Sequence, residues 1–406
     1  MQRGDIEATR IPENALDVLA QQITAEVAVK TWDYKELYHL VRQSYCYRDL
    51  PESVFENVVE MLSGRLSHSP LQALIPRLNW DRINNRLIAR RGSRLVAVMN
   101  GGTIPDRGYY GVYLENTNVK LGEVEEEFVF ESRVAEVFFL GNSEWLIKQI
   151  TTDRIIVSPF AAINPRAPFW KGDTLHREYS TSKNIGRFRR KLIEKIRDGQ
   201  AQKWLLEKFS VDENTAVNLV DYFVRQQKKG QVIATDKRVV VETTIDSGGQ
   251  PLLILHATFG ARVNGAWAIA LSAALEQHYQ TRIQYSYDDD GILIRLPDVT
   301  DPPPYDWLFS LSEQKIEQFL MAALTQSSVF QVHFRYNAAR SLMLPRSNPG
   351  KRIPLWLQRL RASDLLQTVG KQAEFPVVTE TYRECLQDVF DLPRLKAIIA
   401  DLGKGH

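Results

Sequence analysis

Apolar positions in the first third of the chain follow helical spacing. In residues 12–30 they recur every three or four positions, which predicts an amphipathic helix with one face built for packing. Asp33 with Glu36, and Ser53 with Glu56, match the capping-box pattern ahead of two further helical runs. The first 64 residues therefore predict three helices.

A different pattern follows between residues 77 and 99. The short runs RLNWDR, RLIARR and RLVAVM are separated by INN and RGS, which are typical turn residues. Such runs predict the strands of a small antiparallel ribbon. Three helices followed by a hairpin is the order of elements in a winged helix.

The remainder of the chain mixes strands and helices. Runs rich in β-branched and aromatic residues predict a small sheet or barrel, with strands at 109–114, 119–132, 137–140, 145–150 and 155–158. Helices are expected at 184–209, 212–227 and 266–279, strands at 239–244, 252–256, 283–287 and 292–295, and mainly helices after residue 301. The fold class expected is α+β.

Length and composition describe a folded protein. With 406 residues, of which 44% are hydrophobic and 25% charged, the chain has room for two to four domains of roughly 100 to 200 residues each. Its most apolar run, 266–275, is about half as long as a membrane span needs. The two cysteines, Cys46 and Cys385, lack any zinc-type or disulfide spacing. We expect a cytoplasmic protein without a membrane partner.

The net charge of +2 hides strong local asymmetry. Six arginines meet one aspartate in 77–94, nine Lys and Arg meet three acids in 183–208, and eight Lys and Arg meet one aspartate in 335–371. Part of the compensating negative charge lies in residues 121–136, where there are six glutamates and one arginine. Three separate basic segments favour a polyanionic partner.

Motifs for catalysis are missing from the sequence. It contains no GxxxxGK[ST] loop, no HExxH, no GxSxG and no paired CxxC, and its one Asp-Glu pair, at 212–213, has no phosphate-binding loop to accompany it. The three acids Asp288, Asp289 and Asp290 precede Gly291 between two expected strands and indicate a hairpin turn rather than a metal site. We therefore assign no catalytic residue, no metal ligand and no cofactor to this chain.

Several sequence blocks together carry a family resemblance. They are PENALDVLAQQI (12–23), GGTIPDRGYYGVYL (101–114), LGEVEEEFVFESR (121–133), APFWKGD (167–173), ATDKRVVVE (234–242), HATFGARVNGAWAIAL (256–271), DDGILIRLPD (289–298), LMLPRSNPGKRIPLW (342–356) and ETYRECLQDVFDLP (380–393). In content and order they resemble the large helicase-related (Lhr-type) superfamily 2 DEAD/DEAH-box helicases. Departures are local, such as Thr258 where proline is common in the family.

The resemblance implies an architecture. The chain is similar to the part that follows the two RecA-like ATPase domains, namely a winged helix with an N-terminal bridging helix (1–100) and a DEAD/H-associated domain (101–406). The latter is expected to contain barrel strands (101–165), a helical part (166–230), further strands and a helix (231–300) and a helical, winged-helix-like module (301–406). ATP and Mg²⁺ would bind only in the RecA-like domains, so the chain is expected to be a gene fragment, the product of a split gene or a trimmed chain.

The resemblance also implies a role and partners. The chain would grip single-stranded DNA or RNA, or an RNA:DNA duplex, for an ATP-dependent 3′ to 5′ helicase acting in DNA repair or RNA:DNA unwinding. Its partners would be the RecA-like motor domains upstream in the same gene or a split one. By itself it should bind nucleic acid without hydrolysing ATP.

Strand tracking needs basic groups for phosphates and an apolar or aromatic side chain that stacks on a base. Trp145, after the GNS turn, aligns with a family tryptophan that stacks on the nucleic acid, although it could equally be a core aromatic. Leu78, beside Arg77, is the second candidate for this wedge, and Trp170 with Lys171 could contact the strand from a proline-flanked loop. The phosphate candidates are Arg340, Arg346, Lys351, Arg352 and Arg359.

Two other functions stay open at this stage. A winged helix combined with a barrel could present a carboxylate to a flipped nucleotide, as in a stand-alone base-excision (DNA glycosylase-like) enzyme. A protein-docking module is the third possibility, but it would not need three basic segments.

Overall fold

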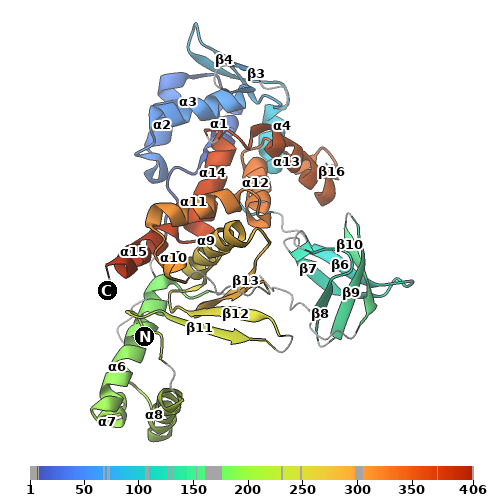
Figure 1. Ribbon diagram of the computed structural model, residues 1–406. Helices are drawn as coiled ribbons and strands as arrows, with labels where there is room; N and C mark the ends of the chain where they lie inside the picture. Colours follow the sequence, from blue (N-terminus) through green and yellow to red (C-terminus); the bar gives the residue numbers. More distant parts are fainter. Residues whose placement is uncertain are drawn as a thin grey trace. The chain divides into compact units, whose positions relative to one another are not determined.

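The computed structural model describes residues 7, 9–66, 69–70, 74–105, 109–125, 128–129, 132–141, 143–151, 153–160, 176–229, 232–246, 249–297, 305–372 and 374–404. The chain forms two compact units, each assembled from distant segments (Figure 1). The first unit contains Thr9–Asp173 and Thr325–Cys385; the second contains Met1–Ala8, Thr174–Leu324 and Leu386–His406. The sequence-based division at residue 100 stays a prediction.

The first unit begins with a winged helix. Its elements are α1 (Leu16–Val29), β1 (Trp32–Asp33), α2 (Tyr34–Arg42), a 3₁₀ turn (Tyr45–Tyr47), α3 (Glu52–Leu62), β4 (Leu78–Asp81) and β5 (Arg86–Ala89), with the strands in the order β1-β5-β4. The Asp33 side chain accepts from the backbone N–H groups of Lys35 and Glu36, which confirms the first predicted cap. The second cap was wrong, because α3 already begins at Glu52 and makes no side-chain cap.

The run RLVAVM departs from the predicted strand. It forms α4 (Ser93–Asn100), and a short ribbon, β2 (Arg65–Leu66) with β3 (Ser69–Pro70), precedes the winged-helix hairpin. Gly92, with φ of +90°, turns the chain out of β5 so that α4 can pack against α1. A five-residue apolar run such as LVAVM (95–99) matches both helical and strand periods, so its tertiary partner decides between them.

The next part of the first unit is a curled five-stranded sheet that forms a half-barrel. Its strands are β6 (Tyr109–Leu114), β7 (Lys120–Glu125), β8 (Val137–Leu140), β9 (Ser143–Ile150) and β10 (Arg154–Pro159), in the order β7-β6-β10-β9-β8. Only the β6–β10 pair is parallel. The inner face buries Val112, Phe138, Ile147 and Val157, one from each of four strands. All five predicted strands are confirmed, with β7 shorter than expected.

Helices from the C-terminal part of the chain complete the first unit. They are α12 (Ser328–Arg340), α13 (Leu355–Val369) and α14 (Pro376–Glu384), which runs into a π-helical turn (Cys385–Val389). The ribbon β15 (Ser347–Asn348) and β16 (Lys351–Arg352) lies between α12 and α13. Helices α12 and α14 pack against each other and against α1, so segments more than 300 residues apart along the chain meet in this unit.

The second unit contains a sheet, a buried helix and a three-helix bundle. The sheet has the order β11-β12-β14-β13, from β11 (Val240–Ile245), β12 (Pro251–His256), β13 (Gln284–Tyr287) and β14 (Gly291–Arg295). Helix α9 (Ala261–Tyr279) packs on β13 and β14 and also contacts α11 (Glu313–Leu324) and α15 (Leu392–Gly403), and α10 (Tyr305–Phe309) precedes α11. The bundle consists of α6 (Tyr179–Arg197), α7 (Ala201–Lys208) and α8 (Glu213–Lys228). The α+β class is confirmed.

The acidic run of the second unit forms the β13–β14 turn, as predicted. The Asp288 side chain accepts from the N–H groups of Asp290 and Gly291, each at 2.8 Å. Asp289 additionally accepts from the N–H of Ala261 at 2.8 Å, at the N-terminus of α9. Within the described part of the chain, no helix is long and apolar enough to cross a membrane.

Candidate nucleic-acid interface

Trp145 lies on β9, between β8 and β10 of the half-barrel sheet. It pairs with Phe138 of β8 and Pro159 of β10, and its ring packs against the half-barrel core while remaining partly exposed. Its indole N–H points toward the carbonyl of Leu140 at 3.4 Å, a long and weak hydrogen bond. Trp145 is therefore both anchored and accessible, and its predicted stacking role stays a prediction.

The other wedge candidate is placed differently. Leu78 is fully buried in the winged helix, so in this arrangement it offers no face to a base. Its neighbour Arg77 is buried as well, and burial lowers the pKa of its guanidinium. Arg77 donates to the carbonyls of Leu342 and Met343 at 2.8 and 3.4 Å, which ties the winged helix to the turn after α12.

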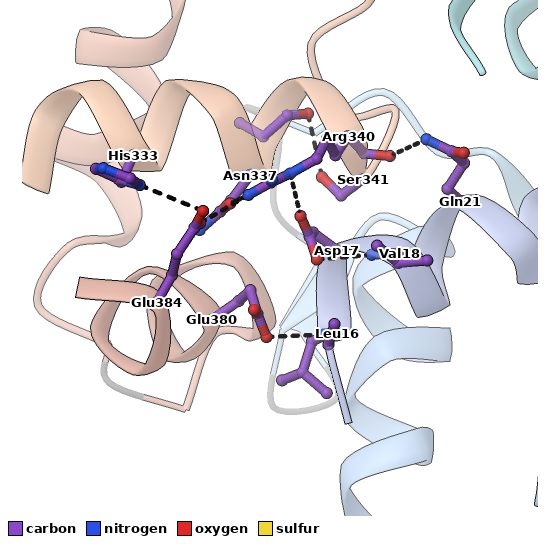
Figure 2. A network of polar contacts seen from close by, with 12 residues as sticks. Leu16, Asp17, Val18, Gln21, His333, Asn337, Arg340, Ser341, Glu380 and Glu384 are labelled. Carbon is purple, nitrogen blue, oxygen red and sulfur yellow. Dashed lines mark hydrogen bonds and ion pairs between the residues drawn. The ribbon is translucent and has the colours of Figure 1, made fainter. Parts of the chain in front are cut away.

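Arg340 occupies the centre of a buried polar network (Figure 2). Its Nε lies 2.5 Å from Asp17 Oδ2, and its Nη2 lies 2.7 Å from Glu384 Oε2. On the far side of Glu384, His333 Nδ1 lies 3.4 Å from Oε1, and the Gln21 amide donates to the Arg340 carbonyl at 2.8 Å. With its side chain only 14% exposed, Arg340 joins α1, α12 and α14.

The pKa values of two carboxyl groups on α14 are shifted in opposite directions. Burial would raise the pKa of Glu384, but the hydrogen bond and charge of His333, together with Arg340, lower it to about 2. Burial raises the pKa of Glu380 to about 7, against the opposing effect of Arg383. Glu380 also accepts from the Leu16 N–H at 2.8 Å (Figure 2), so it holds the start of α1.

Arg346 is held by backbone carbonyls. Its guanidinium donates to the carbonyls of Ile104, Gly101 and Asn100 at 2.9, 3.2 and 3.3 Å. In return, the Asn100 side chain accepts from the N–H groups of Arg346 and Ser347 at 2.7 and 2.8 Å. Through these hydrogen bonds and ion pairs, Arg77, Arg340 and Arg346 connect the winged helix to α12 and to the segment that follows it. We call this set of contacts the polar joint.

The ribbon after this joint carries two more phosphate candidates. Lys351 and Arg352 form β16, paired with Asn348 and Ser347 of β15, and Gly350 makes the turn with φ of +70°. Because Asn100 fixes the backbone at the base of the ribbon, both positions are held on a rigid support. The structure describes the backbone of these two residues. Trp170 and Lys171 lie outside the described residues.

Helix α13 supplies one predicted residue and one that the sequence reasoning missed. The guanidinium of Arg359 lies over the ring of Tyr110 on β6, 4.3 Å from its centroid, and so links α13 to the half-barrel. Trp356, three residues earlier on α13, has 43% of its surface exposed, the largest exposure of any tryptophan whose side chain is described. Its place in the basic segment 335–371 was the available signal.

The chemistry of these groups is that of binding. Among the residues that the structure describes, no three His, Cys, Asp or Glu side chains are grouped so as to hold a metal ion. The guanidinium groups of Arg77, Arg340 and Arg359 meet carbonyls, carboxylates and a ring, respectively. Trp145 and Trp356 supply partly exposed aromatic surface, and the β15–β16 ribbon carries two basic residues. Rings for stacking and cations for phosphates are the elements of a single-strand binding surface.

Two family models match the chain. The model described as "Large helicase-related protein, winged helix domain" matches residues 1–165, and the one described as "DEAD/H associated" matches residues 233–406. Together they account for most of the chain.

Named relatives agree with these matches. "Lhr helicase/ probable uracil glycosylase" of Mycolicibacterium smegmatis is 40% identical over 401 residues, which are 97% of this chain and 26% of the relative. "ATP-dependent helicase Lhr-Core" of Saccharolobus solfataricus is 29% identical over 407 residues, 97% of this chain and 46% of the relative. The chain thus spans about a quarter of the first and under half of the second.

A solved structure is also similar. The helicase Lhr of Mycobacterium smegmatis, described as bound to ssDNA and AMP-PNP, matches with a TM-score of 0.75 and 35% identity. The match covers 100% of this chain and 47% of that one. The likeness therefore extends over both compact units.

Proposed function

Because this chain belongs to the large helicase-related (Lhr) family, we propose that it is the nucleic-acid-gripping module of an ATP-dependent helicase. In this role it holds a single strand of DNA or RNA while RecA-like domains supply the movement. The observation that carries the proposal is the likeness, over the whole chain, to an Lhr helicase described as bound to ssDNA.

The proposed grip combines stacking with charge. Trp145, anchored on β9 of the half-barrel, would stack on a base, an interaction worth about 1 to 3 kcal/mol. Lys351 and Arg352, on the ribbon held by Asn100, would contact phosphates. The buried joint around Arg340 would keep the winged helix in a fixed orientation toward α12 and α14. Rigid supports favour binding because little side-chain and backbone entropy is lost.

Nucleotide chemistry belongs to other domains in this proposal. The sequence has no phosphate-binding loop, and its Asp212–Glu213 pair caps and begins helix α8, so ATP and Mg²⁺ would bind in RecA-like domains, for which the greater length of the relatives leaves room. We further propose 3′ to 5′ movement and a role in DNA repair or RNA:DNA unwinding. The direction of movement is tested by joining this chain to RecA-like domains and measuring strand displacement on duplexes that carry either a 3′ or a 5′ tail. Movement from 3′ to 5′ predicts displacement of the 3′-tailed duplex.

A salt titration tests the grip itself. Binding of the purified chain to a labelled oligonucleotide should weaken as salt rises, with a log–log slope of about 0.7 per phosphate contact. Four to six contacts would give a slope of about 3 to 4. A flat response would contradict a phosphate-binding groove. ATP turnover stimulated by single-stranded DNA, in a preparation free of other helicases, would contradict the placement of nucleotide chemistry elsewhere.

A base-excision activity is the second candidate, because two bacterial relatives carry "uracil glycosylase" in their names. This chain spans only 26% of each of them. Incubation of the chain with a uracil-containing oligonucleotide, followed by alkaline cleavage, separates the two functions. Strand breaks at the uracil position would assign catalysis to this chain, and intact strands would leave binding as its function.

A further inference from the structure

The basic residues of α6 fall into two groups that differ in their contacts. On the side facing the sheet of the second unit, Arg190 Nε lies 2.8 Å from Asp236 Oδ1, and Arg189 Nη2 lies 3.0 Å from Asp290 Oδ1. Gly186 lies on the same side, where an added Cβ would come within 2.5 Å of the Asp236 backbone nitrogen. These contacts hold α6 closely against the unit.

Four other cations of α6 follow a separate row, spaced by four residues, and the first of them, Lys183, lies over the ring of Tyr179. Arg187, Lys191 and Lys195, here called the α6 ridge, are spaced by four residues, so they lie on successive turns about 6 Å apart along the helix. Arg187 and Lys191 are exposed and Lys195 is half-buried. Arg187 contacts Asn184 and Lys195 contacts Gln200, which are both uncharged. Among the described residues no ridge nitrogen forms an ion pair within 4.0 Å, and the charge of Arg187 acts on the Asp236 carboxylate without such a contact.

The ridge is rigidly supported. Leu192 and Phe188, on the other side of α6, pack into the core that α6 shares with α7 and α8. The ring of Phe188 stacks on Trp204 at 5.8 Å between centroids. A row of charges on a fixed helix loses little entropy when it meets a row of opposite charges.

We propose that the α6 ridge binds the phosphate backbone of a nucleic-acid duplex, as a second surface separate from the single-strand grip. Three cations in a row, none of which forms an ion pair with a described carboxylate, match a polyanion with regularly spaced charges. Duplex is favoured over single strand because single-strand surfaces combine cations with aromatic rings for stacking. The aromatic rings of α6 are engaged elsewhere: Phe188 is in the bundle core, and Tyr179 lies beneath Lys183 and Arg394.

The test compares two triple variants with equal change of charge. Arg187→Gln, Lys191→Gln and Lys195→Gln together remove the ridge. Arg282→Gln, Lys315→Gln and Lys404→Gln remove three exposed cations of the same unit that do not form a row. Binding of each protein to a blunt-ended DNA duplex, to a single-stranded oligonucleotide and to polyglutamate is measured against salt.

Loss of the ridge is expected to lower the duplex log–log salt slope by about 2.7, at about 0.9 per phosphate, and to leave single-strand binding unchanged. The control triple is expected to change the duplex slope by less than 1. Equal effects of the two triples, no effect of either, or a loss confined to polyglutamate would each overturn the proposal. The last of these outcomes would indicate an acidic protein partner.

Two further measurements keep the result interpretable. Melting temperature shows whether the ridge triple is folded. Lys191→Gln alone, at an exposed position with no side-chain hydrogen bond or ion pair among the described residues, should lower the duplex slope by about 0.9. A Lys191→Gln protein with an unchanged slope would count against the ridge even if the triple were unstable. A blunt-ended duplex has no single-stranded tail, so the two oligonucleotides report on the two surfaces separately. If only the ridge proposal is wrong, single-strand binding is still observed. If the proposed single-strand grip is wrong, single-strand binding is absent.

Discussion

Arg340 and Asp17 form a buried ion pair that joins the end of α12 to the first turn of α1, with 2.5 Å between Nε and Oδ2. Asp17 is 2% exposed, so almost all of its hydration is lost on folding. Burial therefore raises its pKa, and Arg340 provides the main opposing interaction. A buried charge pair of this kind is costly to break on one side, because the remaining charge has no partner.

Arg340→Met should destabilise the protein by about 3 to 5 kcal/mol at pH 7, since it leaves Asp17 without its cation and removes one partner of Glu384. The loss should be smaller at pH 5, where protonation of the carboxyl groups relieves the buried charge. Urea unfolding followed by tryptophan fluorescence at both pH values measures this. Combining Arg340→Met with Asp17→Asn should cost less than the sum of the two single changes, and simple additivity would argue against coupling.

Glu380 should give stability an unusual pH dependence. Burial raises its pKa to about 7 in the folded protein, so the native state holds a proton that the unfolded chain releases near pH 4.5. The contribution of Glu380 to the free energy of unfolding is thus fully present below about pH 4.5 and is lost as the pH rises to about 7. The total loss is at most about 3 kcal/mol. Glu380→Gln should remove this slope in unfolding experiments between pH 4.5 and 7. An unchanged slope would assign the effect to another group.

Trp145→Ala should weaken single-strand binding by about 1 to 3 kcal/mol without changing the salt slope, because no phosphate contact is lost. Since the ring also packs on the half-barrel core, some loss of thermal stability should accompany it. Trp145→Phe keeps a ring and should restore most of the affinity. A Trp145→Ala protein that is destabilised but binds normally when folded would show that the residue serves only the core.

Trp356→Ala tests the exposed ring on α13. If it stacks on a base, affinity for a single strand should fall by about 1 to 3 kcal/mol while the melting temperature stays close to that of the wild type. Leu360→Ala is the matched control, because Leu360 is also exposed on α13 but has no ring. Equal loss of affinity in the two variants would indicate a general apolar contact.

The β15–β16 ribbon should contribute charge rather than stability. Lys351→Gln with Arg352→Gln should lower the single-strand salt slope by about 1.4 if both side chains touch phosphates. Arg346→Gln should instead lower the melting temperature, because the backbone carbonyls of Asn100, Gly101 and Ile104 would lose their donor. An Arg346→Gln protein with full stability and a reduced slope would reverse this assignment.

Local patterns in the sequence were sufficient to locate most elements. The strands at 109–114 and 137–140 and the cap at Asp33 were predicted as the structure has them, because alternation and capping involve neighbours along the chain. The α4 segment was mistaken for a strand, because a short apolar run fits both periods and packing against α1 decides between them.

The sequence by itself determined the fold class, the positions of most helices and strands, and the three basic segments, since these depend on residue type and local spacing. Only the tertiary structure decided what each basic residue contacts. Arg77 meets carbonyls, Arg340 meets two carboxylates and Arg359 meets a ring, whereas the α6 ridge faces outward. These partners come from segments far away along the chain, and no local pattern encodes which distant group folding will bring to a given side chain.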